Sequence, residues 1–308
     1  MVDLALSFEF YLSYLAAMRK EGHLIRASVR TIIDEVAKSG LIEPLTGKAH
    51  PPQTVMIDRE RPQISLGAGA FNCRSRADML AIQHGVSMLP PRLRQRPRIL
   101  GAEGITPLSM ILRTLTPYYL PSEYLPKREE TEKHFPIQHL DLMDIQLPAN
   151  SFDLFFGAHV FEHVPDVGRA IQQVSKVIKP GGILVSTFPF DPDRENTVTK
   201  ARLDASGSIE YLTEPEYHKN PVQQKEGSLV FQLPGWDVLD TCRAAGLTEA
   251  ALVMFASSVQ GVLGRKGLGA FALLARKPID GDAREMKAIR QRREWQVQRS
   301  ARCFVWAP

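Results

Sequence analysis

The sequence predicts an α/β protein with a parallel sheet that helices cover on both faces. From Arg98 onward, short apolar runs alternate with amphipathic stretches, a pattern typical of strands that alternate with helices. The stretch "RILGAEGITPLSM" (98–110) joins a strand, a glycine turn and the start of a helix. The run "FDLFFGAHV" (152–160) is apolar enough to form a strand that is buried on both faces.

The stretches that precede this domain are expected to be mainly helical. Residues 1–20 are predicted to form a helix, because apolar residues between Phe8 and Leu15 recur with i, i+3, i+4, i+7 spacing. A second helical stretch has apolar residues from Val29 to Val36 on one face. Residues 40–75 contain more Gly, Pro and polar residues, which favours irregular structure.

A linker is predicted at "LPPRLRQRPR" (89–98), where prolines interrupt helices and arginines favour solvent. We therefore expect an N-terminal helical extension (1–90), a main domain (91–280) and a C-terminal tail (281–308). The extension could form a lid or a homodimer contact. The tail carries seven Arg or Lys and three Asp or Glu. This basic tail could contact nucleic acid or an anionic surface. A solvated helix that packs on its own domain or on a second subunit is the favoured interpretation.

The composition is that of a globular protein, with 44% hydrophobic and 23% charged residues among 308. No apolar run approaches the roughly 18 residues that a membrane span needs. Asp3 and Glu9 argue against a signal peptide, so a cytoplasmic location is expected. Cys73, Cys242 and Cys303 are far apart and form no C-x-x-C pair. The sequence therefore predicts neither a metal site nor a disulfide framework.

The elements of the main domain follow one another in a regular order. Thr106 and Pro107 suit the N-cap and first-turn positions of a helix. The run "KPGG" (179–182) is expected to end a later helix, and residues 190–232 show little periodicity. So long a connection in a compact domain is usually a lid or a binding loop. The other expected strands are 98–102, 118–124, 136–140, 183–188, 250–256 and 269–276, with helices around 170–178 and 235–246.

Acidic residues at the ends of successive strands indicate a nucleotide-like cofactor. A turn that leads from a strand into a helix directs free backbone N–H groups outward, and the turn "GAEG" (101–104) lies at such a place. Glu123 ends the next strand, where a carboxylate can accept hydrogen bonds from both ribose hydroxyls. Asp141 follows the third strand, where a carboxylate can accept from an adenine amino group. Together the three positions predict a cofactor site.

The stretch "QHLDLMDIQLPANSFDLFFGAHVFEHVPDVGRAIQQVSKVIKPGGILVSTFPF" (138–190) resembles the middle of a class I S-adenosylmethionine-dependent methyltransferase. The resemblance covers roughly residues 98–276. It implies a Rossmann-like fold with a mostly parallel seven-stranded sheet. The stretch "GSIEYLTEPEYHKNP" (207–221) is similar to one in a bacterial subgroup found near sugar and natural-product pathways.

The resemblance implies a cofactor site for S-adenosylmethionine, with S-adenosylhomocysteine as the product. It places the turn against the methionine part, Glu123 on the ribose and His159 near the sulfonium. Tyr124 would lie beside the adenine, and Asp141 and Leu142 at its edge. The expected cofactor-binding residues are Gly101, Ala102, Glu103, Gly104, Thr106, Glu123, Tyr124, Asp141, Leu142 and His159.

The turn departs from the pattern of the family, which has an acidic residue followed by glycines spaced as G-x-G-x-G. Here Gly101 replaces the acid, Glu103 lies inside the turn and Pro107 replaces the last glycine. Either Glu103 supplies the displaced carboxylate, or the turn no longer binds a cofactor. We favour the first interpretation, because Glu123 and Asp141 remain in place.

Methyl transfer from a sulfonium needs positioning more than it needs a metal or a covalent nucleophile. A hydroxyl acceptor benefits from a general base, and the candidates are His218 and His159; His163 is expected to be structural. No base is needed for some acceptors. Aromatic faces can stack on ring substrates, and two arginines could bind an anionic acceptor, although packing roles are also open. The candidate acceptor residues are Tyr211, Tyr217, Trp236, Arg74 and Arg76.

The sequence thus favours an enzyme that methylates a small molecule, and the expected acceptor is a hydroxyl of a saccharide or secondary metabolite. An RNA ribose methyltransferase is the first alternative, suggested by the basic tail. Strand 152–160 ends without the N/D-P-P-Y/F motif of base-amino methylation, which argues against a nucleic-acid partner but leaves ribose methylation open. The second alternative is a non-catalytic methyltransferase-like partner protein, suggested by the altered turn.

Overall fold

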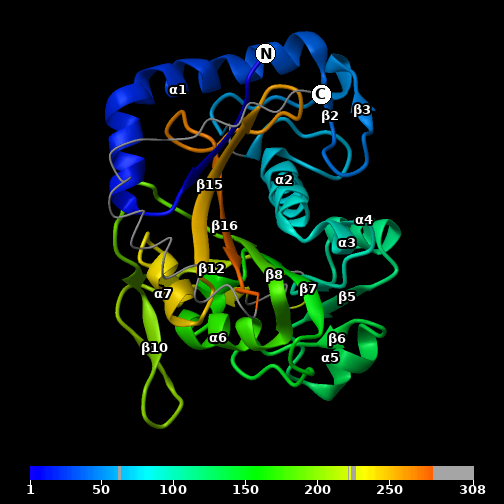
Figure 1. Ribbon diagram of the computed structural model, residues 1–308, viewed down its shortest axis with the longest axis vertical. Helices are drawn as coiled ribbons and strands as arrows, with labels where there is room; N and C mark the ends of the chain where they lie inside the picture. Colours follow the sequence, from blue (N-terminus) through cyan, green and yellow to red (C-terminus); the bar gives the residue numbers. More distant parts are fainter. Residues whose placement is uncertain (62–63, 221, 223–226, 280–308) are drawn as a thin grey trace. The chain divides into compact units, whose positions relative to one another are not determined.

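The computed structural model describes residues 1–61, 64–220, 222 and 227–279, and it divides into two compact units (Figure 1). Unit 1 comprises Met1–His84, Ala251–Leu273 and the described residues after Lys277. Unit 2 comprises Gly85–Ala250 and Leu274–Lys277. The basic tail predicted at 281–308 lies outside the described residues. Among the described residues, no helix is long and apolar enough to cross a membrane.

The main sheet has eight strands, in the order β1-β15-β16-β8-β7-β4-β5-β6. The predicted Rossmann-like α/β fold is confirmed, and β1 adds an eighth strand to the seven expected. The strands are β1 (Asp3–Phe8), β4 (Ile99–Gly101), β5 (Tyr119–Glu123), β6 (Gln138–His139), β7 (Phe152–Ala158), β8 (Ile178–Thr187), β15 (Glu249–Ser257) and β16 (Ala270–Arg276).

In unit 1, the prediction of a helix from the first residue is wrong for Asp3–Phe8, which forms β1. This strand pairs antiparallel with β15, from Asp3 opposite Ser257 to Phe8 opposite Leu252. The alternation in "DLALSF" suits a strand, and the partner that stabilises it lies far away in the sequence. The two predicted helices are one continuous helix, α1 (Tyr11–Ser39). The remaining elements wholly within unit 1 are β2 (Leu41–Ile42), β3 (Ala49–His50) and η1 (Pro52–Thr54).

In unit 2, the strands β5, β4, β7 and β8 are parallel neighbours. Helix α4 (Pro107–Leu115) begins as predicted, because the Thr106 side chain accepts a hydrogen bond from the backbone N–H of Ser109. Apolar residues on one side of α6 are buried, as their spacing predicts. The helices are α3 (Pro91–Arg94), α4, α5 (Arg128–Lys133), η3 (Phe161–His163), α6 (Val167–Val177) and α7 (Val238–Ala244), while α2 (Cys73–Met88) spans the boundary between the units.

The run "KPGG" (179–182) lies inside β8 and does not follow the helix as a separate turn. Helix α6 ends at Val177 and β8 begins at Ile178. The register with β7 shifts between Phe152, which pairs with Ile178, and Leu154, which pairs with Ile183. The extra residues therefore form an irregularity at the start of β8.

The insertion 190–232 contains short two-stranded pairs, which its weak periodicity did not predict. Strand β10 pairs with β11, β12 with β13, and β14 with β9. The β10 hairpin extends away from the strands of unit 2 (Figure 1). The bounds are β9 (Val198–Thr199), β10 (Ala201–Leu203), β11 (Ile209–Tyr211), β12 (Tyr217–His218), β13 (Ser228–Leu229) and β14 (Gln232–Leu233).

Candidate cofactor and acceptor site

The parallel pairing in unit 2 brings the predicted cofactor residues to one edge of the sheet. Gly101 pairs with Phe156 on one side and with Pro121 on the other. Glu123 pairs with His139 at the end of β5. Since the carboxyl ends of parallel strands meet at the same edge, the residues that follow β4, β5, β6 and β7 lie along one line.

The turn after β4 is closely packed, which explains its two glycines. A Cβ atom at Gly101 would lie 2.3 Å from the hydroxyl of Tyr119. At Gly104 it would lie 2.7 Å from Cγ2 of Ile137 and 3.1 Å from the backbone oxygen of Ser122. The Gly104 N–H also donates to that oxygen at 2.7 Å. The glycines therefore let the turn approach β5, which fixes the backbone where a ligand would contact it.

Glu123 has the most perturbed carboxyl group at this edge. Its side chain is partly buried, and burial raises its pKa to about 7, although a hydrogen bond from the Tyr124 N–H lowers it somewhat. The ring of Tyr124 lies next to that of His139, with centroids 5.8 Å apart. A carboxylate that is costly to ionise in this place gains from partners that donate hydrogen bonds, such as the two hydroxyls of a ribose.

Asp141 and Leu142 follow β6. Oδ1 of Asp141 accepts a hydrogen bond from the backbone N–H of Met143 at 2.8 Å, which fixes the carboxylate against its own turn. Leu142 is buried. A fixed carboxylate beside a buried apolar residue suits the edge of an adenine ring, where one amino group donates and the ring face is apolar.

His159 directly follows β7 and has a left-handed backbone conformation, with φ of 55°. Its N–H donates to the backbone oxygen of Thr187 at 2.7 Å. Nδ1 lies 3.4 Å from Oε1 of Glu162, while Nε2 is buried and has no hydrogen-bond partner among the described residues. The end of β7 thus places an imidazole whose Nε2 atom can still accept or donate a hydrogen bond.

Glu162, which the sequence analysis missed, connects this edge to the insertion. Its side chain is 0% exposed. Besides His159, its Oε1 lies 3.8 Å from Nε2 of His163 and 3.8 Å from Nδ1 of His218. Burial lowers the pKa of His163 below its ordinary value. The candidate base His218 therefore lies beside the same buried carboxylate as His159, although the two histidines come from different segments.

The aromatic residues predicted for the acceptor have different environments. Tyr211 and Tyr217 are exposed, and their hydroxyl oxygens lie 3.3 Å apart. Trp236 is only 3% exposed, and its Nε1 donates to the backbone oxygen of Pro192 at 2.9 Å. Trp236 thus packs the insertion, whereas the two tyrosines are about half exposed.

The two arginines belong to unit 1, and they also differ. Arg74 is exposed. Arg76 is 0% exposed and donates to the backbone oxygens of Leu66, Phe71, Gln260 and Gly261 at 2.6–3.3 Å. Burial lowers the pKa of Arg76 to about 10. Its donors are used within unit 1, so Arg76 stabilises these loops and does not present its charge to an acceptor.

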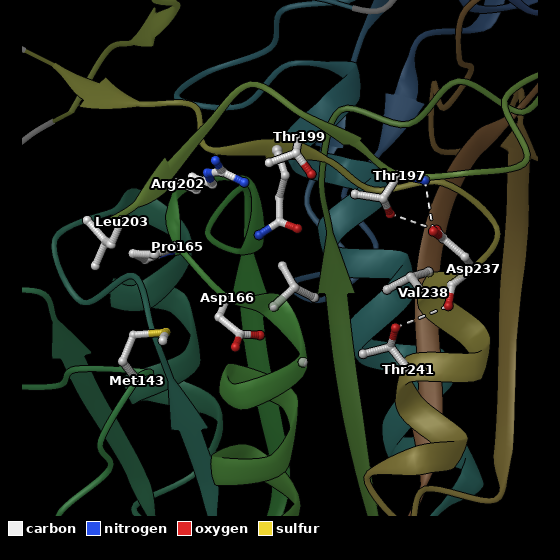
Figure 2. Close-up of a pocket in the computed structure, with 13 residues that line it drawn as sticks. Met143, Pro165, Asp166, Thr197, Thr199, Arg202, Leu203, Asp237, Val238 and Thr241 are labelled. Carbon is white, nitrogen blue, oxygen red and sulfur yellow. Dashed lines mark hydrogen bonds between the residues drawn. The ribbon is translucent and has the colours of Figure 1, made fainter. Parts of the chain in front are cut away.

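Unit 2 also contains a cavity of about 500 Å³ (Figure 2). None of the residues predicted to bind the cofactor lines it. In Figure 2, Thr197 and Thr241 point toward Asp237, which accepts a 2.6 Å hydrogen bond from the Thr197 hydroxyl on its Oδ1. The lining residues are Met143, Pro165, Asp166, Val167, Gly168, Thr197, Thr199, Arg202, Leu203, Gln232, Asp237, Val238 and Thr241.

The parallel strands, the glycine turn after β4 and the carboxylate side chains at the strand ends define a Rossmann-like protein. Residues 119–186 match the family model described as a methyltransferase domain. Over 169 residues the chain is 25% identical to the 27-O-demethylrifamycin SV methyltransferase of Amycolatopsis mediterranei (strain S699), covering 49% of this chain and 62% of that relative. The chain therefore spans less than two thirds of the length of this curated relative.

Two solved structures are similar at low identity. One is an S-adenosylmethionine-dependent methyltransferase from Mesorhizobium loti, with 18% identity, a TM-score of 0.39, and coverage of 64% of this chain and 98% of that one. The other is the 1,6-didemethyltoxoflavin-N1-methyltransferase of Burkholderia thailandensis, with 14% identity, a TM-score of 0.33, and coverage of 64% and 78%.

The domain match runs from β5 into β8, through the strands that end in the candidate site. With the sheet order given above, it confirms the resemblance seen in the sequence. Residues 119–186 are therefore similar to a methyltransferase domain, within a Rossmann-like sheet.

Proposed function

We propose that this protein transfers the methyl group of S-adenosylmethionine to a hydroxyl of a small natural product or saccharide. The observation that carries the proposal is the alignment of the glycine turn, Glu123 and Asp141 at the ends of successive parallel strands. The name of the relative from Amycolatopsis, an O-methyltransferase of a natural product, supports the acceptor class.

The chain's own residues would bind and orient the cofactor. Glu123 would accept hydrogen bonds from the ribose hydroxyls, while Asp141 and Leu142 would hold the adenine edge. The turn 101–104 would place its backbone against the methionine part, where Glu103 can pair with the α-amino group. S-adenosylmethionine supplies the electrophilic methyl group when it is bound.

We further propose that His159 is the general base. Its Nδ1 faces the Glu162 carboxylate, which stabilises a positive imidazolium, and its buried Nε2 has no hydrogen-bond partner among the described residues. His218 lies between Glu162 and Glu216, which suits a positioning role better than proton transfer. Tyr211 and Tyr217 remain candidates for stacking against the acceptor.

The experiment that tests the cofactor site is calorimetric titration with S-adenosylmethionine and S-adenosylhomocysteine. Glu123→Gln keeps the shape and removes the charge, and losing one or two charge-assisted hydrogen bonds should weaken binding about 10- to 100-fold. Glu129→Gln, on the exposed surface of α5, is the matched control and should bind like the wild type. No binding by the folded wild type, or equal binding by Glu123→Gln, would refute the site.

The base is tested once an acceptor has been found by a screen of hydroxyl-bearing natural products and sugars. His159→Gln should lower kcat by 10²- to 10⁴-fold, the usual contribution of a general base, with little change in cofactor affinity. An unchanged kcat would exclude His159 as the base.

A further inference from the structure

The cluster around Glu162 contains a buried carboxylate whose charge is not balanced by hydrogen bonds. The side chain is 0% exposed, and neither oxygen has a hydrogen-bond partner among the described residues. Burying an ionised carboxylate in this way is costly unless a positive charge lies close by. The groups that face it are the three histidines His159, His163 and His218.

His163 presents a nitrogen without a proton to this carboxylate. Its Nδ1 lies 2.8 Å from the backbone oxygen of Leu229. A carbonyl oxygen only accepts, so Nδ1 carries the hydrogen and donates it. In the neutral ring Nε2 then has a free lone pair, and this is the atom that faces Glu162 at 3.8 Å.

His218 has the same arrangement as His163, but the roles of Nδ1 and Nε2 are exchanged. Its Nε2 lies 3.2 Å from Oε1 of Glu216, and the other Glu216 oxygen pairs with Lys200. A salt-bridged carboxylate only accepts, so Nε2 of His218 carries the hydrogen. The lone pair of Nδ1 faces Glu162 at 3.8 Å. Each outer N–H is thus held by an oxygen acceptor, as in histidines that bind metals.

Three lone-pair atoms therefore converge from Glu162, His163 and His218, and they all lie within 4.8 Å of one another. Lone pairs that face each other repel unless a cation lies between them. In a tetrahedral zinc site with ligand distances near 2.1 Å, neighbouring ligand atoms are about 3.4 Å apart. The two separations of 3.8 Å from Glu162 exceed this value by about 0.4 Å, and the third, between Nε2 of His163 and Nδ1 of His218, lies within 4.8 Å.

We propose that Glu162, His163 and His218 form a binding site for a divalent transition-metal ion, best suited to Zn²⁺. Two imidazole nitrogens and one carboxylate oxygen suit zinc and its first-row neighbours, whereas Mg²⁺ and Ca²⁺ favour oxygen ligands. Three protein ligands leave a fourth position for an oxygen ligand, as in catalytic zinc sites. The ion would tie β12 of the insertion to the segment that follows β7.

The open position also has a chemical consequence, which rests on the proposed function. A metal-bound hydroxyl loses its proton more easily, and His159 lies 3.4 Å from the same Glu162 oxygen. The imidazole of His159 is thus close enough to take the proton of an acceptor hydroxyl bound to the ion. Metal binding itself does not depend on this step.

The test uses the whole 308-residue chain, without a histidine tag, after treatment with a chelator. Co²⁺ is the probe, because a four-coordinate nitrogen and oxygen site gives it a visible absorption band, and Zn²⁺ is then titrated in competition. We expect one equivalent to bind. His218→Gln and His163→Gln should each weaken binding more than tenfold, whereas His23→Gln, an exposed histidine of α1, should not. Circular dichroism confirms that each variant is folded.

Glu216→Ala tests the tautomer argument separately. It leaves all three ligands in place but removes the acceptor that orients His218, so binding should weaken about tenfold or more. No uptake by the folded wild type, or uptake unchanged by His218→Gln, would overturn the proposal. Calorimetry with S-adenosylhomocysteine distinguishes the two hypotheses: a protein that binds metal but not this ligand refutes the proposed function alone.

Discussion

Lowering the pH from 8 to 6 should weaken the binding of S-adenosylhomocysteine about tenfold through the protonation of Glu123. Its carboxyl has a pKa of about 7 because the side chain is partly buried. The ionised form accepts hydrogen bonds from both ribose hydroxyls, and the protonated form loses part of this capacity. About a tenth of the molecules are ionised at pH 6 and about nine tenths at pH 8, which gives the tenfold ratio.

The coupling between ligand binding and the ionisation of Glu123 also determines whether protons are released or taken up on binding. Bound hydroxyls favour the ionised form and lower the pKa of Glu123, so binding near pH 7 releases about half a proton per site. Calorimetry in two buffers of different ionisation enthalpy measures this number directly.

Glu123→Gln separates this effect from titration of the ligand itself. The variant should bind more weakly at pH 8 but with the same affinity at pH 6 and pH 8, apart from any ligand contribution that both proteins share. Equal pH dependence in the wild type and in Glu123→Gln would refute the assignment of the proton to this carboxyl.

Three further substitutions have expected outcomes that urea denaturation and calorimetry can measure. Gly104→Ala introduces a Cβ atom 2.7 Å from Ile137, so it should cost about 1–3 kcal/mol of stability and weaken cofactor binding; unchanged values would contradict the close packing. Thr106→Ala removes the N-cap of α4 and should cost about 1 kcal/mol. Arg76→Met leaves four backbone oxygens without their donor and should cost about 3 kcal/mol or more, whereas Arg74→Met should cost almost nothing because Arg74 is exposed.

The parts of the fold that could be predicted depend on local signals. Strand β7 is buried at every position, and an apolar run of that length between turn residues indicates a buried strand by itself. The Thr106 cap is similarly local, because donor and acceptor lie three residues apart. The positions of Glu123 and Asp141 followed from strand ends, which these runs locate to within a residue or two.

The parts that could not be predicted depend on distant partners. Strand β1 is stabilised by pairing with β15, near the other end of the described chain. The apolar residues that follow from Phe8 have helical spacing, so the local pattern favours a helix. The role of Arg76 depends on carbonyl groups of Gln260 and Gly261. No sequence pattern adjacent to these residues predicts those long-range contacts.

Glu162 is a residue of the candidate site whose role also depends on a distant partner. It connects the cofactor edge of the sheet to the insertion 190–232. In "FEHVPD" it reads as one acidic residue in a turn, and the histidine that completes its surroundings, His218, follows 55 residues after His163. One oxygen of Glu162 lies within 3.4–3.8 Å of His159, His163 and His218. The proposed base at the cofactor edge and the insertion over it therefore share a single buried carboxylate. For that reason Glu162→Gln should disturb both metal binding and the pH profile of turnover, whereas His218→Gln should disturb metal binding and leave the His159–Glu162 contact in place.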